Sequence, residues 1–190
     1  MTQRVPSLSR SIATGAIGFA VVSLCIFATV AFAERWMYRT FTVLGAYLVW
    51  TLLFILLGGV VFGSLVVVRW RLPKFYLLFA LAFFAYAAGW VIAYFVLRGA
   101  VGELVGSLGG SVLMAIVFAA GFGSLRSTVK LSAALFVSNS LGYFLGSALN
   151  NSFGGRLGML LWGIAYGLFF GAGIGAALHL VQREQQNEFS

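Results

Sequence analysis

The chain has 190 residues, of which 62% are hydrophobic and only 8% are charged, and its mean hydropathy is +1.03. These values exclude a soluble domain, whose surface carries far more charge. The formal net charge is +8, but the basic residues stand singly rather than in the clusters that bind phosphate groups, so nucleic acid is not an expected partner. Residues 1–190 are therefore expected to form a single membrane domain in contact with the lipid bilayer.

Six apolar stretches are each long enough to cross a hydrocarbon core, which takes about 20 helical residues. They cover residues 12–33, 41–68, 75–97, 101–124, 131–149 and 157–181. The sequence thus predicts an all-α integral membrane protein, a six-transmembrane-helix antiparallel bundle. Phe62-Gly63-Ser64-Leu65 and Phe122-Gly123-Ser124-Leu125 close the second and fourth stretches, which suggests either three related helical hairpins or a chance match.

The first stretch has a second interpretation. Arg4 and Arg10 precede it and Ala31-Phe32-Ala33 ends it, so residues 1–33 could also be a secretory signal peptide that is cleaved. Its 22 apolar residues exceed the roughly 7–15 of a signal-peptide core, and this length favours a membrane span.

The third stretch carries two neighbouring stripes at helical spacing. Its aromatic stripe consists of Tyr76, Phe79, Phe83, Tyr86, Trp90 and Tyr94, and its small-residue stripe of Ala82, Ala85, Gly89 and Ala93. Small residues allow close helix approach, so the second stripe is expected to pack against another helix. The aromatic stripe could line a site for a flat or lipidic ligand, but we expect it to face acyl chains.

The fourth stretch has a row of glycines at Gly102, Gly106 and Gly110, and one acidic residue, Glu103. Glu103 lies about one turn from the start of the helix. There the helix dipole stabilises a carboxylate, which could also pair with Arg98. This stabilising role is expected, and the alternative is a cation or proton site at the mouth of a cavity.

The fifth and sixth stretches contain the remaining glycine rows. The fifth has Ser138, Gly142 and Gly146, and the sixth has Gly163, Gly167, Gly171 and Gly175. Such ridges bring membrane helices together, and we expect these two to pack against one another, with Gly173 pointing elsewhere.

Two polar residues in the same region are candidate site residues. Asn139 falls near the middle of the fifth stretch, where it is expected either to hydrogen-bond another helix or to contact a polar ligand. His179 lies in the last turn of the sixth stretch, where the helix dipole stabilises a positively charged imidazolium.

The basic residues predict the orientation. Eight of them lie on the side of the two termini and of residues 69–74 and 125–130, and four lie on the side of 34–40, 98–100 and 150–156. Because basic residues accumulate on the cytoplasmic side, both termini are expected in the cytoplasm and the protein in the cell membrane.

No catalytic constellation is visible. The four acidic residues, one histidine and one cysteine form neither a metal-ligand pattern nor a nucleophile–base pair, and no phosphate-binding loop occurs. We therefore expect no enzymatic activity and no cofactor. We expect an accessory or assembly subunit of a membrane complex, which contacts other membrane proteins or itself. The alternative is a small-solute transport component, a substrate-capture subunit or facilitator without its own proton relay or ATPase.

The first stretch also contains small residues in Ala16-Ile17-Gly18-Phe19-Ala20. In this feature, in length, in span count and in cytoplasmic termini, the chain resembles the substrate-capture subunits of energy-coupling-factor vitamin transporters. The resemblance implies that this segment docks a partner subunit. It extends to the architecture alone, because no ligand-binding motif of that family is recognisable.

Overall fold

The computed structural model describes residues 5–67 and 72–188, and these residues form helices without any strand. The helices are α1 (Leu8–Gly63), α2 (Leu72–Leu97), α3 (Gly99–Gly121), α4 (Thr128–Phe153) and α5 (Gly155–Glu188), with a short 3₁₀ turn at Leu125–Ser127. Within this part of the chain, five helices are long and apolar enough to cross a membrane. The all-helical membrane class is confirmed at that level, whereas the six-span count is not. Arg4, Arg69 and Arg71, which entered the charge count, lie outside the described residues.

Helix α1 folds back on itself. Thr42 has φ 61° and ψ 175°, which interrupts the helix and separates an arm of residues 8–41 from an arm of residues 43–63. Gly18 lies against Val61, and the Trp50 indole donates a hydrogen bond of 3.0 Å to the Thr29 hydroxyl. In a straight helix Gly18 and Val61 would be about 65 Å apart, so the two arms are antiparallel neighbours.

The connections at one end of the bundle are much shorter than expected. Residues 34–40 continue the first arm of α1, and the predicted gaps at 98–100 and 150–156 each shrink to one non-helical residue. Thr42, Arg98 and Gly154 all have φ between 53° and 64° and ψ between 166° and 175°. A single such residue reverses the chain while the flanking helices keep their backbone groups hydrogen-bonded, as a membrane requires.

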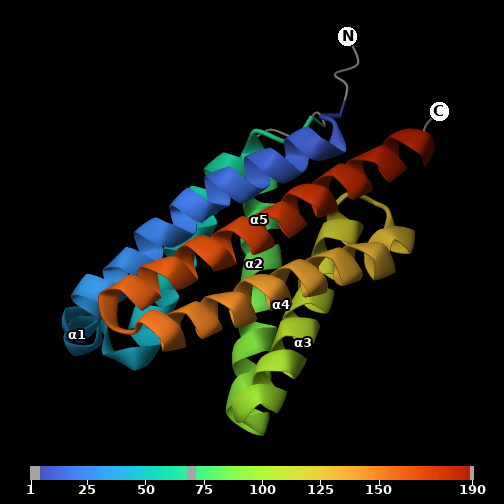
Figure 1. Ribbon diagram of the computed structural model, residues 1–190. Coiled ribbons are helices and arrows are strands. Elements are labelled where there is room, and N and C mark those ends of the chain that lie inside the picture. Colours follow the sequence, from blue (N-terminus) through green and yellow to red (C-terminus); the bar gives the residue numbers. More distant parts are fainter. Residues whose placement is uncertain (1–4, 68–71, 189–190) are drawn as a thin grey trace.

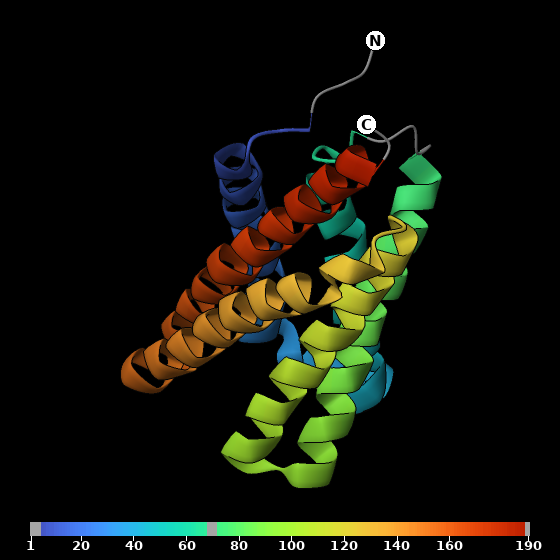
Figure 2. The same cartoon turned by 90° about the vertical axis from the view of Figure 1, so that its right-hand side faces the viewer.

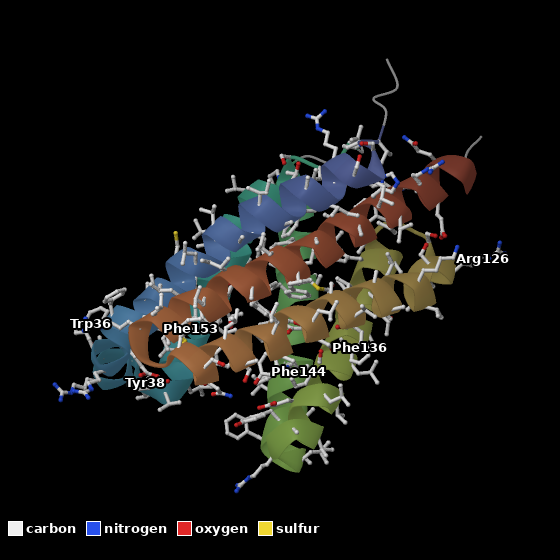
Figure 3. All side chains as sticks on the ribbon, in the orientation of Figure 1. Trp36, Tyr38, Arg126, Phe136, Phe144 and Phe153 are labelled. Carbon is white, nitrogen blue, oxygen red and sulfur yellow. The ribbon has the colours of Figure 1, made fainter. Side chains whose placement is uncertain are left out.

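Helix α5 lies between the first arm of α1 and α4, while α2 and α3 run side by side (Figures 1 and 2). The beginning of α1 and the end of α5 lie at the same end of the bundle, where the His179 ring nitrogen Nδ1 is 2.8 Å from the Pro6 carbonyl oxygen. Figure 3 shows Trp36, Tyr38 and Phe153 at the opposite end from Arg126. The turns therefore divide between two ends of the bundle.

The glycine ridge of α5 packs against α1, so the prediction that its partner is the fifth stretch was wrong. A Cβ atom on Gly167 would lie 2.5 Å from the Ala20 Cα and 2.7 Å from the Phe19 carbonyl oxygen. Gly171 and Gly175 are in the same way pressed against Gly15 and Ser11. The small residues of 16–20 are thus in contact with this chain's own helices.

Helix α4 meets α5 on another face. Gly142 lies against Tyr166 and Phe169, and Gly146 lies against Trp162. Gly173 does point away from the ridge, but a Cβ there would fall on the Ser138 side chain of α4. Gly173 is therefore close-packed as well, because α5 is enclosed by helices on both sides.

The glycines of α3 bring it against α2. Gly102 contacts Tyr94, Gly106 contacts Trp90, and Gly89 of α2 lies against Gly110 and Leu113. The prediction that the small-residue stripe of α2 packs against another helix is confirmed at Gly89.

Both repeated Phe-Gly-Ser-Leu segments are fixed by the end of α5. The Gln182 amide donates to the Leu65 carbonyl oxygen at 3.2 Å and accepts from the Val67 amide at 2.9 Å. The Glu184 carboxylate accepts hydrogen bonds from Ser124 and Ser127 and pairs with Lys130 at 2.9 Å. The polar end of α5 thus ties together the ends of α1 and α3.

Candidate functional site

An aromatic cavity of about 340 Å³ lies among four of the helices. Both arms of α1, together with α2, α4 and α5, supply its walls, whereas α3 supplies none. Eleven of its eighteen lining residues are aromatic: Phe27, Tyr38, Tyr47, Trp50, Phe54, Phe83, Tyr86, Trp90, Tyr143, Trp162 and Tyr166. The other lining residues are Ile26, Val30, Glu34, Thr51, Ala87, Val91 and Met159. The volume falls within the range of pockets that bind small molecules.

The cavity extends from the bundle interior toward the end where Thr42 reverses α1. Its outer part contains Glu34 and Tyr38, and Tyr38 is labelled in Figure 3 near that end of the molecule. Its inner part contains Phe54 and Phe83, whose rings stack with centroids 5.5 Å apart. The site is therefore an aromatic pocket with a polar mouth.

Three residues of the aromatic stripe of α2, namely Phe83, Tyr86 and Trp90, line this cavity, so the expectation that they face acyl chains was wrong. Phe83 and Tyr86 are buried, and both line the cavity together with Trp90. Phe79 of the same stripe is completely buried between them and α1. The reason is that the small-residue stripe lies against α3, which turns the neighbouring stripe inward.

A buried hydrogen-bond network forms the floor of the cavity. The Tyr86 hydroxyl donates to the Asn139 side-chain oxygen at 2.7 Å, and the Tyr166 hydroxyl lies 3.2 Å from that of Tyr86. Because the Asn139 oxygen only accepts, Tyr86 uses its proton there, and Tyr166 is the donor to Tyr86. The Asn139 amide donates to the Ser107 hydroxyl at 2.5 Å, and Ser107 lies 2.9 Å from the Ser140 hydroxyl.

This network answers the question that the sequence left open for Asn139. Its side chain is fully buried and hydrogen-bonds residues of α2 and α3, which is the interhelical account. Through Tyr86 it also fixes the orientation of two tyrosines that line the cavity. Asn139 thus positions cavity residues rather than lining the cavity itself.

Two acidic residues are connected with the cavity: Glu34, from the predicted gap at 34–40, and Glu103, from the fourth apolar stretch. Glu34 lines its mouth and accepts a hydrogen bond of 3.1 Å from the Tyr38 hydroxyl. The negative charge of Glu103 acts on Tyr143, which lines the wall. Among the described residues, Glu103 forms no ion pair with Arg98 within 4.0 Å, and the one such pair there is Lys130 with Glu184. The expected pairing of Glu103 with Arg98 is therefore not found among the described residues.

His179 belongs to the other end of the molecule. It is buried in α5, and Nδ1 donates its proton to the Pro6 carbonyl oxygen, because a carbonyl can only accept. It does not line the aromatic cavity. In the part of the chain that the structure describes, no group of three or more His, Cys, Asp and Glu residues is placed to hold a metal ion.

Sequence reasoning missed the residues of α1 and α5 that complete the cavity, chiefly Glu34, Trp50, Trp162 and Tyr166. Glu34 was assigned to a loop, although it lies four residues before Tyr38 and shares one helix face with it. That spacing is the one signal in the sequence that could have linked an acidic residue to the aromatic ones.

Comparison of the chain with protein-family models, with curated proteins and with solved structures gave no match.

Proposed function

We propose that this chain is an integral protein of the cell membrane that binds a small, flat molecule in the aromatic cavity. In this proposal it serves transport as a substrate-capture subunit or facilitator, with no chemical step, proton relay or ATPase of its own. The observation that supports it is the cavity: aromatic rings from four helices surround a space of about 340 Å³. Aromatic walls present flat faces against which a ring system can stack.

The proposal includes six membrane crossings, with the two arms of α1 counted separately. The reversal at Thr42 supports this count, because each arm is then a single crossing. The distribution of basic residues supports cytoplasmic termini, and the mouth of the cavity then opens on the outer side. A solute arriving from outside would reach Glu34 and Tyr38 first.

The accessory-subunit role is the second candidate function. The cavity supports small-molecule binding more directly than it supports a role in assembly. Large apolar side chains cover the outside of the helices, such as Leu44, Val96 and Val129, which are 71%, 73% and 79% exposed. Lipid is sufficient to cover such residues, so they do not call for a protein partner.

Native mass spectrometry of the protein extracted with its own lipids tests the proposal. We expect a small bound molecule on the wild-type chain. Ala87→Trp should abolish its binding, because Ala87 lines the cavity and the larger side chain fills it. The matched control is Ala133→Trp, which places the same side chain at an exposed alanine of α4.

Two results would contradict the proposal. One is a small molecule that remains equally bound to Ala87→Trp, since its site is then elsewhere. The other is a wild-type chain that carries no small molecule but co-purifies with larger membrane proteins, which would favour the accessory role.

A further inference from the structure

The mouth of the cavity holds the only charged side chain among its lining residues. That residue is Glu34, and none of the lysine and arginine residues that the structure describes lines the cavity. Although the chain has a formal net charge of +8, a ligand in the cavity thus meets the negatively charged Glu34 carboxylate.

The Glu34 carboxylate has capacity left for a ligand. One of its oxygens accepts the hydrogen bond from Tyr38, and the other has no hydrogen-bond partner among the described residues. No basic group of the described residues lies within 4.0 Å of this carboxylate. Arg156, a basic residue at the same end, instead places its guanidinium 4.9 Å from the centre of the Phe32 ring.

Three aromatic residues, Tyr38, Tyr47 and Trp50, line the cavity together with Glu34. Tyr38 and Tyr47 both meet Trp50 edge to face, with centroids 6.0 Å and 5.5 Å apart. The Trp50 indole nitrogen is already bonded to Thr29, which holds the ring in place. Aromatic faces set at steep angles around an acidic group form the kind of cage that attracts cations.

Resting on the proposed function, we infer that the ligand is an organic cation with a flat apolar body. Its positively charged amine or quaternary ammonium group lies between Glu34 and the rings of Tyr38, Tyr47 and Trp50. Its ring system lies further in, against Phe54 and Phe83. An anionic ligand would meet no basic side chain among the described lining residues and would be repelled by Glu34.

Glu103 strengthens this electrostatic preference. Its negative charge acts on Tyr143 of the cavity wall, although Glu103 itself does not line the cavity. The other two acidic residues, Glu184 and Glu188, lie near the end of α5, at the opposite end of the bundle.

The test uses three probes that share one ring system and differ in charge. 2-Naphthylmethylamine is a cation at neutral pH, 2-naphthylmethanol is neutral, and 2-naphthoate is an anion. Their binding is measured by equilibrium dialysis against the full chain in phosphatidylcholine nanodiscs, with empty nanodiscs as the reference. These zwitterionic lipids do not concentrate the cation by themselves.

We expect the amine to bind roughly tenfold more tightly than the alcohol, and the carboxylate to bind most weakly. Glu34→Gln should remove the advantage of the amine and leave the affinity for the alcohol unchanged. The control Glu184→Gln alters an acidic residue at the other end of the bundle and should leave all three affinities unchanged.

The possible failures are distinguishable. If the alcohol or the carboxylate binds at least as tightly as the amine, the cationic ligand is wrong but the cavity remains a binding site. If the amine keeps its advantage in Glu34→Gln, the carboxylate is not its counter-ion and the inference fails. If none of the three probes binds, the proposed function fails together with this inference.

Discussion

The close approach of α5 to α1 leads to a sharp prediction at Gly167. A methyl group there would lie 2.5 Å from the Ala20 Cα, 2.7 Å from the Phe19 carbonyl oxygen and 2.7 Å from the Ser23 Cβ. None of these atoms can rotate away, because two belong to the backbone and the third is fixed to it. The helices must therefore move apart when Gly167 is replaced by alanine.

The size of the effect follows from the distances. Carbon atoms pack at about 3.5–4.0 Å, so Gly167→Ala requires a separation of the two helices by about 1 Å. Such a gap forfeits a quarter to a half of each dispersion contact along the seam, and overpacking of this kind costs about 1–3 kcal/mol. For a chain of this length, about 2 kcal/mol lowers the melting temperature by roughly 4–8 °C.

The assay is thermal unfolding in detergent, followed by the loss of helical circular dichroism. Gly109 of α3 provides the matched control, because an added Cβ there meets nothing within 4 Å. Gly109→Ala should be neutral or raise stability by up to about 1 kcal/mol through helix propensity. If Gly167→Ala melts like the wild type while Gly109→Ala is destabilised, the proposed seam between α1 and α5 does not exist.

Four further predictions follow. Arg98→Gly should raise stability by about 1 kcal/mol, because Arg98 adopts φ 53° and ψ 166° without a side-chain capping bond, and a lower melting temperature would contradict the strain assigned to this turn. Asn139→Leu should cost about 1–3 kcal/mol, since it removes one hydrogen bond from each of two buried hydroxyl groups, those of Tyr86 and Ser107, and an unchanged melting temperature would count against the network. Glu103→Gln should cost at most about 1 kcal/mol and leave ligand binding intact, whereas a folded chain that no longer binds would show that Glu103 is part of the site. A reporter fused after Arg39 should score as external and one after Ser190 as cytoplasmic, and the opposite result at Ser190 would overturn the six-crossing topology.

The sequence by itself determined the class of the protein and several local features. Apolar stretches of membrane-spanning length separated by charged residues specify helices in a bilayer, because only a helix satisfies its own backbone groups there. The small-residue rows also identified surfaces of close approach correctly, as at Gly89 and Gly106, because a missing side chain has the same effect whatever the partner is.

The sequence could not decide which helix meets which face. In a soluble protein a polar stripe distinguishes the outside from the core, but in a membrane both sides of a helix are apolar. The aromatic stripe of α2 therefore could not be recognised as a cavity wall, and the ridge at Gly167 could not be assigned to α1 rather than α4.

The candidate site depended on tertiary structure for the same reason. Glu34 and Trp50 line the same cavity although the reversal at Thr42 separates them along α1. Tyr86, Asn139 and Tyr166 come from three different helices. Local spacing defines faces only around one helix axis, whereas the cavity results from how five helical segments are rotated and packed against one another. Only the tertiary structure fixes those rotations, because each is the joint result of every close contact along the helix.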